Sequence, residues 1–252
     1  MGGEMCSAID EFYASDVAAV HQKILQHPVA LSHLSAEGIK FDGKILGRDI
    51  EAIDFPFGEV SGADLAYLFC VFNGSRVHGQ LERTIGPDNA PPGYYMTVIN
   101  GRVIAGGHKN KFGIVQRQGG DADLFISDMH IDHLYLSRHG APPLLGTLAF
   151  ALCAITAMRA GLSRITLIAA DGRYGGGYVG VKVWPKFGFD APLFEDETLG
   201  HPQLDGCETV QDVIRVDPTW WDTHGTQRLM EFDLTPASTS WKKMLDYLST
   251  KI

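Results

Sequence analysis

The chain has 252 residues, of which 45% are hydrophobic, and its 30 acidic residues against 21 basic ones give a formal net charge of −9 at pH 7. A chain of this length and apolar content can bury a sizeable core. The acidic excess argues against a broad surface that binds nucleic-acid phosphates, so we expect no nucleic-acid partner.

The first residues and the cysteines bear on where the protein works. The sequence has no basic segment followed by an apolar one at its start, and no run approaching the roughly 18 apolar residues of a membrane helix. We therefore expect a soluble, cytoplasmic protein without a membrane span; a secreted effector without a cleavable signal is the alternative. The cysteines form no CxxC pair, so we expect reduced, mostly buried thiols and no metal site: Cys6, Cys70, Cys153 and Cys207.

The amino-terminal part predicts a helix and an irregular extension. Apolar side chains recur at three- and four-residue steps over residues 4–25, which is typical of an amphipathic helix packed on a larger body, and Pro28 follows its end. Residues 30–65 are rich in Gly and Asp and indicate no particular structure. We expect residues 1–64 to pack on a core domain of residues 65–252.

The core domain begins with segments typical of strands. Residues 65–74 (LAYLFCVFNG) are expected to form a buried strand. The polar residues 73–93 are punctuated by Gly and Pro and are interpreted as a long loop, either inert or placed to recognise a substrate through Arg76, His78, Glu82 and Arg83. Two β-rich runs around Asn100-Gly101 predict a tight hairpin. Residues 111–118 and the long segment 123–137 are expected as further strands.

Helices and strands alternate in the second half. Residues 144–161 are apolar nearly all round, which indicates a buried helix, and residues 164–170 follow as a strand. Residues 180–184 suit a short helix that Pro185 and Gly188 stop. The remaining residues predict an apolar segment at 210–216 and a loop that contains Trp220 and Trp221. A strand at 229–234 follows, and then an amphipathic helix that carries Trp241, Leu245 and Leu248.

This order of elements, with the stretch GGYVGVKVWPKFGFDAP at residues 176–192, resembles the GCN5-related N-acetyltransferase (GNAT) superfamily. The last core helix of that family commonly reads Asn-x-x-Ala-apolar-x-Leu-Tyr-x-x-x-Gly-Phe. The corresponding positions here are Gly177, Gly180, Val181, Val183, Trp184 and Gly188-Phe189. The resemblance implies an α/β fold with a mixed, mostly antiparallel sheet flanked by helices. It also implies splayed parallel strands in the middle, joined through the buried helix.

The resemblance further implies a coenzyme A thioester, acetyl-CoA or another acyl-CoA, as cofactor. The family binds its pyrophosphate on successive backbone N–H groups at a helix start. Here Ala141 and Leu144 stand at the basic and first glycine positions of that loop, and Pro142 and Pro143 lack an N–H. Alternatively, the pyrophosphate binds slightly earlier in the chain, at Arg138, His139 and Gly140. The implied cofactor-binding residues are Leu134, Leu136, Leu145, Gly146, Thr147 and Asp171, the last of which equally suits an Asp-Gly turn.

Three polar side chains alternate along the long strand and suggest catalysis. In DMHIDHLYL the two-residue period puts Asp128, His130 and Asp132 on one face. Two acids around a histidine can tune its pKa toward neutrality, so we predict His130 as the base that takes the proton of an ammonium acceptor. The alternative is a polar sheet surface with solvated side chains. His133 points to the opposite face, so we expect no metal ion shared with His130.

A proton donor for a leaving thiolate is expected beside the glycine triplet. Trp184 occupies the position where the family has a tyrosine and cannot donate a proton as a phenol does. Tyr178 or Tyr174 is predicted to take that role, with simple packing over a turn as the alternative.

The sequence therefore favours an acyltransferase that moves an acetyl or other acyl group from a CoA thioester to an amine of a small molecule or protein. Two other classes stay open: a GNAT-shaped binding module without catalysis, and a bacterial or phage-associated effector with other chemistry. The altered anion loop favours these two, whereas the helix at residues 180–184 and the His/Asp strand favour the enzyme. The sequence does not define the oligomeric state.

Overall fold

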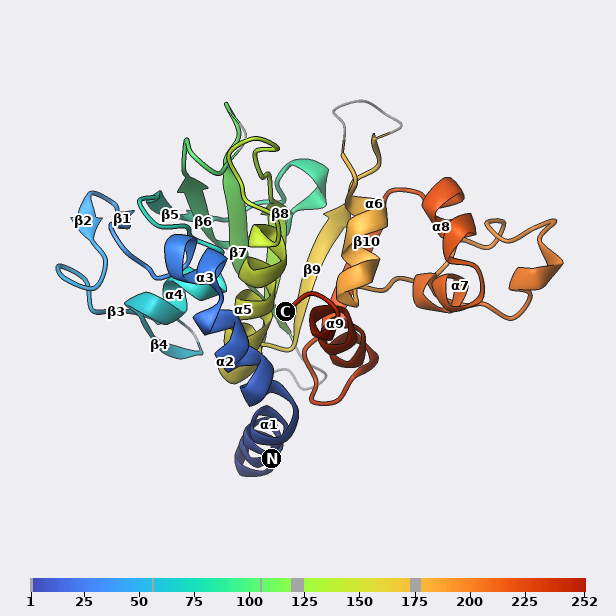
Figure 1. Ribbon diagram of the computed structural model, residues 1–252, viewed down its shortest axis with the longest axis horizontal. Helices are drawn as coiled ribbons and strands as arrows, with labels where there is room; N and C mark the ends of the chain where they lie inside the picture. The colour runs from blue at the N-terminus through green and yellow to red at the C-terminus, as the bar shows by residue number, and fades with distance from the viewer. Residues whose placement is uncertain (1, 56, 105, 119–124, 173–177) are drawn as a thin grey trace.

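The computed structural model describes residues 2–55, 57–104, 106–118, 125–172 and 178–252 (Figure 1). Within these ranges, eight strands form one sheet in the order β10-β9-β8-β7-β6-β5-β1-β2, and β3 and β4 form a separate hairpin. The strands are β1 (Lys40–Phe41), β2 (Lys44–Ile45), β3 (Ala52–Phe55), β4 (Gly58–Ser61), β5 (Arg76–Glu82), β6 (Gly93–Ile99), β7 (Asn110–Gln118), β8 (Phe125–His133), β9 (Arg164–Ala169) and β10 (Arg228–Asp233).

The helices alternate with these strands. The α-helices are α1 (Gly2–Phe12), α2 (Ala18–Gln26), α3 (Pro28–His33), α4 (Gly62–Leu68), α5 (Leu145–Arg159), α6 (Gly180–Val183), α7 (Val210–Val216), α8 (Pro218–His224) and α9 (Thr239–Ser249). One π-helical segment and three short 3-10 segments join them: η1 (Tyr13–Val17), η2 (Pro87–Asn89), η4 (Trp184–Phe187) and η5 (Pro202–Leu204). No helix in the described part of the chain is long and apolar enough to cross a bilayer.

The sheet is mixed and mostly antiparallel, as predicted. Only β8 with β9 and β5 with β1 pair in parallel among the described strands. The parallel pair expected from the sequence is present: β8 and β9 are neighbours, and the chain passes from one to the other through α5. This pair occupies the second and third places from the β10 edge of the sheet.

The two faces of the sheet differ in chemistry. Cys153 of α5 contacts Met129 of β8, with 3.5 Å between the sulfur atoms, so the side of Met129 is the side that α5 covers. α5, α2 and α3 lie in front of the sheet in Figure 1, and α1 projects below it. Side chains on this face are almost fully buried and apolar: Met96, Val98, Phe112, Ile114, Ile131, Ile165, Leu167, Met230 and Phe232. Because side chains alternate along a strand, the even-numbered residues of β8 and β9 lie on the opposite face.

α5 forms the centre of the core, as its all-round apolar sequence predicted. Residues 147–158 of this helix are all buried. Phe150 packs with ring centroids 5.3–5.7 Å from four aromatic side chains, Trp184, Phe187, Phe189 and Phe232. Most of the WPKFGF motif is thus core packing that fixes α6 and η4 against α5.

Two glycines of that motif allow close backbone approaches. A Cβ at Gly180 would lie 2.7 Å from the backbone nitrogen of Ala170, so glycine is needed where α6 begins beside the end of β9. Gly188 has a φ of 97° and lies against the backbone of Ser240. The predicted stop of the short helix at Gly188 is confirmed.

The predicted amino-terminal helix is also confirmed. α1, η1 and α2 cover the predicted helical span, and Pro28 begins α3. These helices contact α5. The following extension joins the main sheet, because Lys40 and Phe41 of β1 pair in parallel with β5.

Two predictions for residues 65–93 are wrong. The apolar run at residues 65–74 is not a strand: it begins inside α4, whose first turn is capped by the Ser61 hydroxyl accepting from the Asp64 N–H at 3.2 Å. A short apolar run fits a buried helix as well as a buried strand, and the cap decides here. The polar segment thought to be a loop contains β5, a seven-residue strand of the main sheet.

Two turn assignments are also corrected. Asn100-Gly101 is not a two-residue hairpin: β6 and β7 pair across a longer connection, and Asn100 is buried. Its Nδ2 donates to Ser75 Oγ at 3.0 Å and its Oδ1 accepts from the Arg102 N–H, so the side chain links this turn to the residues before β5. The tryptophans at 220 and 221 lie in α8 rather than in a loop.

Candidate functional site

The site lies where β8 and β9 part. Their register runs from Met129 opposite Ile165 to Ile131 opposite Leu167 and then stops, although β8 continues to His133 and β9 to Ala169. Such an end leaves strand backbone that is no longer paired to its parallel neighbour. Beyond Ile131, β8 is no longer paired with β9, and the place where the two strand ends are unpaired is called the gap below.

A charged cluster with members on β5, β7 and β8 lies beside this gap. Lys111 Nζ lies 3.0 Å from Asp132 Oδ2 and 2.8 Å from Glu82 Oε1, while His133 Nδ1 lies 3.0 Å from Asp132 Oδ1. Burial raises the pKa of Asp132, but the contacts from His133 and Lys111 outweigh it and hold that pKa below its usual value. Burial lowers the pKa of Lys111, but its bonds to the two carboxylates raise it more. Asp132 and Lys111 are therefore both charged at neutral pH.

Aromatic rings continue the cluster across the gap. Tyr135 packs on His108 and His133, with ring centroids 4.2 and 5.7 Å away. Its hydroxyl donates to the hydroxyl of Tyr178 at 3.2 Å. The Tyr135 N–H donates to Asn110 Oδ1 at 2.7 Å, which fixes the chain after β8. Because Tyr135 follows β8 and Tyr178 follows β9, the two hydroxyls bridge the segments that extend from the parting strands.

His130 has a different environment from that expected. It is 3% exposed, and its Nδ1 lies 3.0 Å from the Thr166 hydroxyl of the neighbouring strand. Burial lowers the pKa of His130 to about 4, although Asp132 acts in the opposite direction. At neutral pH this imidazole is uncharged. The assignment of the base to His130 stays a prediction, and the depressed pKa argues against it because such a group holds a proton weakly.

Asp128 belongs to an ion-pair network rather than to the histidine. Its Oδ2 lies 2.6 Å from Arg117 Nε and 3.0 Å from Arg164 Nε, and Arg164 also binds Glu231 at 2.7 Å. This network joins β7, β8, β9 and β10 on the face away from α5. The predicted acid-His-acid face is thus divided among three sets of partners.

The start of α5 only partly fits an anion site. Leu144 precedes it with a φ of 68°, and the helix has no side-chain cap. The Leu145 N–H donates to the Pro142 carbonyl at 3.2 Å, so this donor is already used. Helix geometry leaves the N–H groups of Gly146 and Thr147 without intrahelical partners. A Cβ at Gly146 would lie 2.8 Å from the end of the Leu136 side chain, so the helix start and the chain after β8 are in close contact.

The other predicted cofactor residues lie near the same edge. Leu134 and Leu136 are half-buried in the chain that leaves β8. Asp171 is buried and forms an antiparallel bridge with Val179. Tyr174 and Gly177 lie outside the described residues.

Several members of the cluster were missed from sequence. Lys111 and Glu82 belong to strands whose neighbours in the sheet cannot be identified from local sequence. The sequence places Glu82 in a loop. Tyr135 and His108 are brought together by the return of the chain between β6 and β7. His133 had been considered only as a metal ligand, and in the described ranges no group of three or more His, Cys, Asp or Glu side chains is arranged to hold a metal ion.

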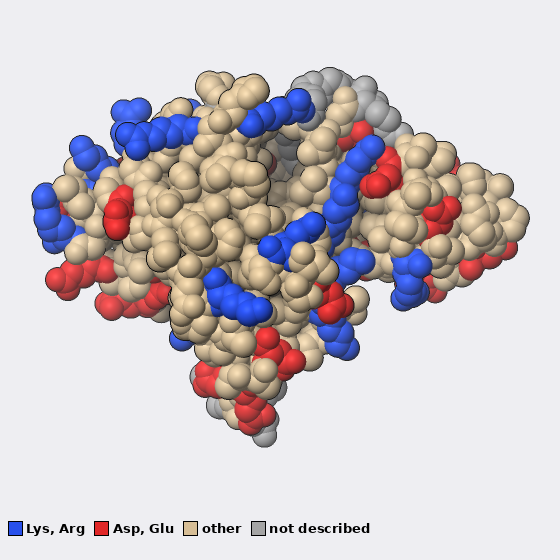
Figure 2. All heavy atoms as spheres, viewed as in Figure 1, with Lys and Arg blue, Asp and Glu red and all other residues tan. Residues whose placement is uncertain are grey.

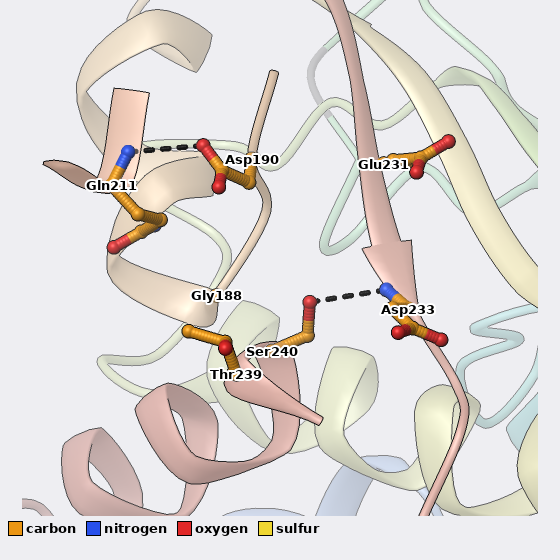
Figure 3. A pocket seen from close by; sticks show the side chains of 7 residues that line it. All are labelled: Gly188, Asp190, Gln211, Glu231, Asp233, Thr239 and Ser240. Carbon is orange, nitrogen blue, oxygen red and sulfur yellow. Dashed lines mark hydrogen bonds between the residues drawn. The ribbon is translucent and has the colours of Figure 1, made fainter. Parts of the chain in front are cut away.

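A cavity of about 190 Å³ lies elsewhere, between β10, the loop after η4 and the start of α9 (Figure 3). Asp190 Oδ1 accepts from the Gln211 N–H at 2.9 Å, and the Asp233 N–H donates to Ser240 Oγ at 3.0 Å. Since Asp233 pairs with Arg164, this cavity is at the amino end of β9, opposite the candidate site.

Comparison with known proteins gives no assignment. No family model, curated protein or solved structure matches this chain.

Proposed function

We propose that the protein is an acyltransferase that transfers an acetyl or other acyl group from a CoA thioester to an amine. The observation that carries the proposal is the interrupted pairing of two adjacent parallel strands, with Asp132, His133, Tyr135 and Tyr178 gathered at the interruption. An extended ligand arm can pair with a strand edge through main-chain hydrogen bonds. The backbone of β8 beyond Ile131 offers such an edge.

Charge also favours an anionic ligand at this end. The first turn of α5 leaves backbone donors, and the helix dipole adds a partial positive charge there. Arg138 precedes this turn and Lys182 lies on α6, and both are exposed. Figure 2 shows Lys and Arg side chains over α6 and along the upper edge of the molecule, whereas acidic ones gather over α1 and around α7 and α8. A CoA thioester bound here would supply the activated acyl group.

The Asp132–His133 pair suits the role of the base. A carboxylate beside Nδ1 orients an imidazole and stabilises its protonated form, so that the ring can take a proton from an ammonium acceptor. Lys111 holds the second oxygen of Asp132 and keeps the carboxylate in place. The His133 side chain is 37% exposed, so it is more accessible than His130.

Tyr178 suits the role of the acid. Its hydroxyl is oriented by the Tyr135 hydroxyl at 3.2 Å, and the residue is 38% exposed. A phenol held at the gap can protonate a thiolate that leaves the acyl carbon.

Binding and turnover test the proposal separately. Calorimetry and thermal unfolding with acetyl-CoA should show binding, with about 2.7 kcal/mol of added stability at 100 times Kd. Thiol release with a mixture of amines should follow. Absence of both binding and release at millimolar acetyl-CoA would contradict the proposal; binding without release would favour the non-catalytic module.

A matched pair of variants tests the base. His133→Asn should lower turnover on the order of 100-fold, the usual scale for a general base, while acetyl-CoA affinity changes little. His130→Asn should stay within a few-fold of the wild type in the folded protein. A larger loss of turnover in His130→Asn than in His133→Asn would identify His130 as the base.

A further inference from the structure

Two cysteines from distant parts of the chain meet in the core, where α4 packs against α5. Cys70 follows the end of α4 and is 1% exposed. Cys153 lies in the middle of α5 and is 0% exposed. Both thiols are unlinked in this structure. A bond between them would join two segments that are far apart in sequence.

Hydrogen bonds to opposite segments bracket the two thiols. Cys153 Sγ donates to the Leu68 carbonyl at 3.0 Å, and Cys70 Sγ donates to the Ala149 carbonyl at 3.5 Å. Within α5 the Ala149 carbonyl also accepts from the N–H of Cys153, so the Cys70 sulfur lies beside the backbone of Cys153. The two thiols are within hydrogen-bonding reach of each other. Each cysteine side chain is therefore directed at the segment that carries the other.

The backbone at Cys70 is a second, independent observation. Its φ of 48° lies in the left-handed region, which residues with a Cβ rarely adopt. Such a conformation persists only where the surrounding structure holds it. The fold thus keeps a thiol at a position where glycine would be less strained, and that thiol contacts the carbonyl oxygen of Ala149.

Burial limits the chemistry that this pair can perform in the folded protein. It raises the pKa of the Cys153 thiol well above its usual value, and the hydrogen bond with Cys70 acts in the same direction. Nucleophilic catalysis and metal binding both need the thiolate, which this environment disfavours. Both cysteines belong to the hydrophobic core, and Met129 Sδ lies 3.5 Å from Cys153 Sγ. An uncharged disulfide suits such surroundings.

We propose that Cys70 and Cys153 are a redox pair whose oxidation to a disulfide joins the segment after α4 to α5 and stabilises the fold. This inference does not depend on the proposed acyl transfer. A cross-link that closes a long loop stabilises a protein mainly because it restricts the unfolded chain. The stability of this protein would then depend on the redox state of its surroundings.

A small disulfide such as oxidised glutathione is the oxidant. One cysteine thiolate attacks a sulfur of oxidised glutathione, forms a mixed disulfide and releases one glutathione thiolate. The other cysteine thiolate attacks the cysteine sulfur of that mixed disulfide and releases the second. Two cysteine thiols are oxidised, one glutathione disulfide is reduced to two thiols, and the released thiolates take up the two protons. Because both thiols are buried, the reaction proceeds while the chain is folding or locally open.

Refolding from urea in a mixture of reduced and oxidised glutathione tests the pairing. Peptide mapping, after alkylation of the remaining thiols, identifies the linked cysteines. The Cys70–Cys153 pair should exceed every pairing that involves Cys6 or Cys207 by about tenfold or more, because the folded structure brings these two thiols together. Cys207→Ser should give the same pair. A mixture without this preference, or no linked cysteines, would overturn the proposal.

Urea unfolding of the oxidised and the reduced protein tests the effect on stability. The oxidised wild type should unfold at a higher urea concentration, and dithiothreitol should abolish the difference. Cys207→Ser should keep the difference. Cys70→Ser, whose hydroxyl can still donate to the Ala149 carbonyl, should show none. Equal midpoints for the oxidised and reduced wild type would overturn the proposed stabilisation, whether or not the variants fold.

Discussion

Replacing His130 by asparagine should flatten the dependence of stability on pH. In the native protein His130 is 3% exposed, and burial lowers its pKa to about 4 from a usual value of about 6.5. Asparagine can place a polar atom near the position of Nδ1, within reach of the Thr166 hydroxyl, but it cannot take up a proton. The substitution removes the titration while keeping a polar partner for Thr166.

The sign of the effect follows from the direction of the shift. The unfolded chain binds a proton at His130 more readily than the folded one, so this contribution to stability is present above about pH 6.5 and is lost as the pH falls toward 4. The shift of about 2.5 units corresponds to about 3.4 kcal/mol when complete, at about 1.36 kcal/mol per unit. Between pH 7 and pH 5 the loss is about 2 kcal/mol.

Urea unfolding at pH 7 and pH 5 measures this difference. His21 and Asp132 also have lowered pKa values and weaken the fold in acid, so the wild type alone does not isolate one residue. The loss of stability from pH 7 to pH 5 should be about 2 kcal/mol smaller in His130→Asn than in the wild type. His139→Asn, at an exposed histidine, should follow the wild type. Equal losses in wild type and His130→Asn would refute the buried, neutral imidazole.

Three further substitutions test the site and the sheet. Gly146→Val should abolish acetyl-CoA binding in a folded protein, because its side chain would meet Leu136 at the start of α5; calorimetry with unchanged affinity would place the anion site elsewhere. Tyr178→Phe should lower turnover on the order of 100-fold and leave donor affinity unchanged in steady-state and binding assays, whereas unchanged turnover would remove it as the acid. Gly113→Ala should destabilise the fold by about 1–3 kcal/mol in urea, because the new Cβ would lie 2.5 Å from the buried Tyr95 ring; an unchanged unfolding midpoint would show that the ring can move.

Local pattern alone was enough for the first helix, for the buried helix and for the two strands that flank the buried helix. The all-apolar residues 144–161 indicate a buried helix, and the first helix, the strand before α5 and the strand after it follow from periodicity of side chains. Gly188 ends the short helical segment with a φ of 97°, which glycine adopts without strain. These features depend on neighbours in sequence or on one residue's own geometry, so they are readable before the fold is known.

Tertiary structure decided the rest because the relevant partners are far apart in the chain. The helix α4 packs against α5, and Asn100 donates to Ser75 instead of forming a hairpin turn, so neither arrangement follows from neighbours in sequence. In the candidate site, the alternation that placed Asp128, His130 and Asp132 on one face could not show which side chains of β7, β8 and β9 each of them contacts. The roles of these groups follow from strand pairing and burial, which set their charges and partners.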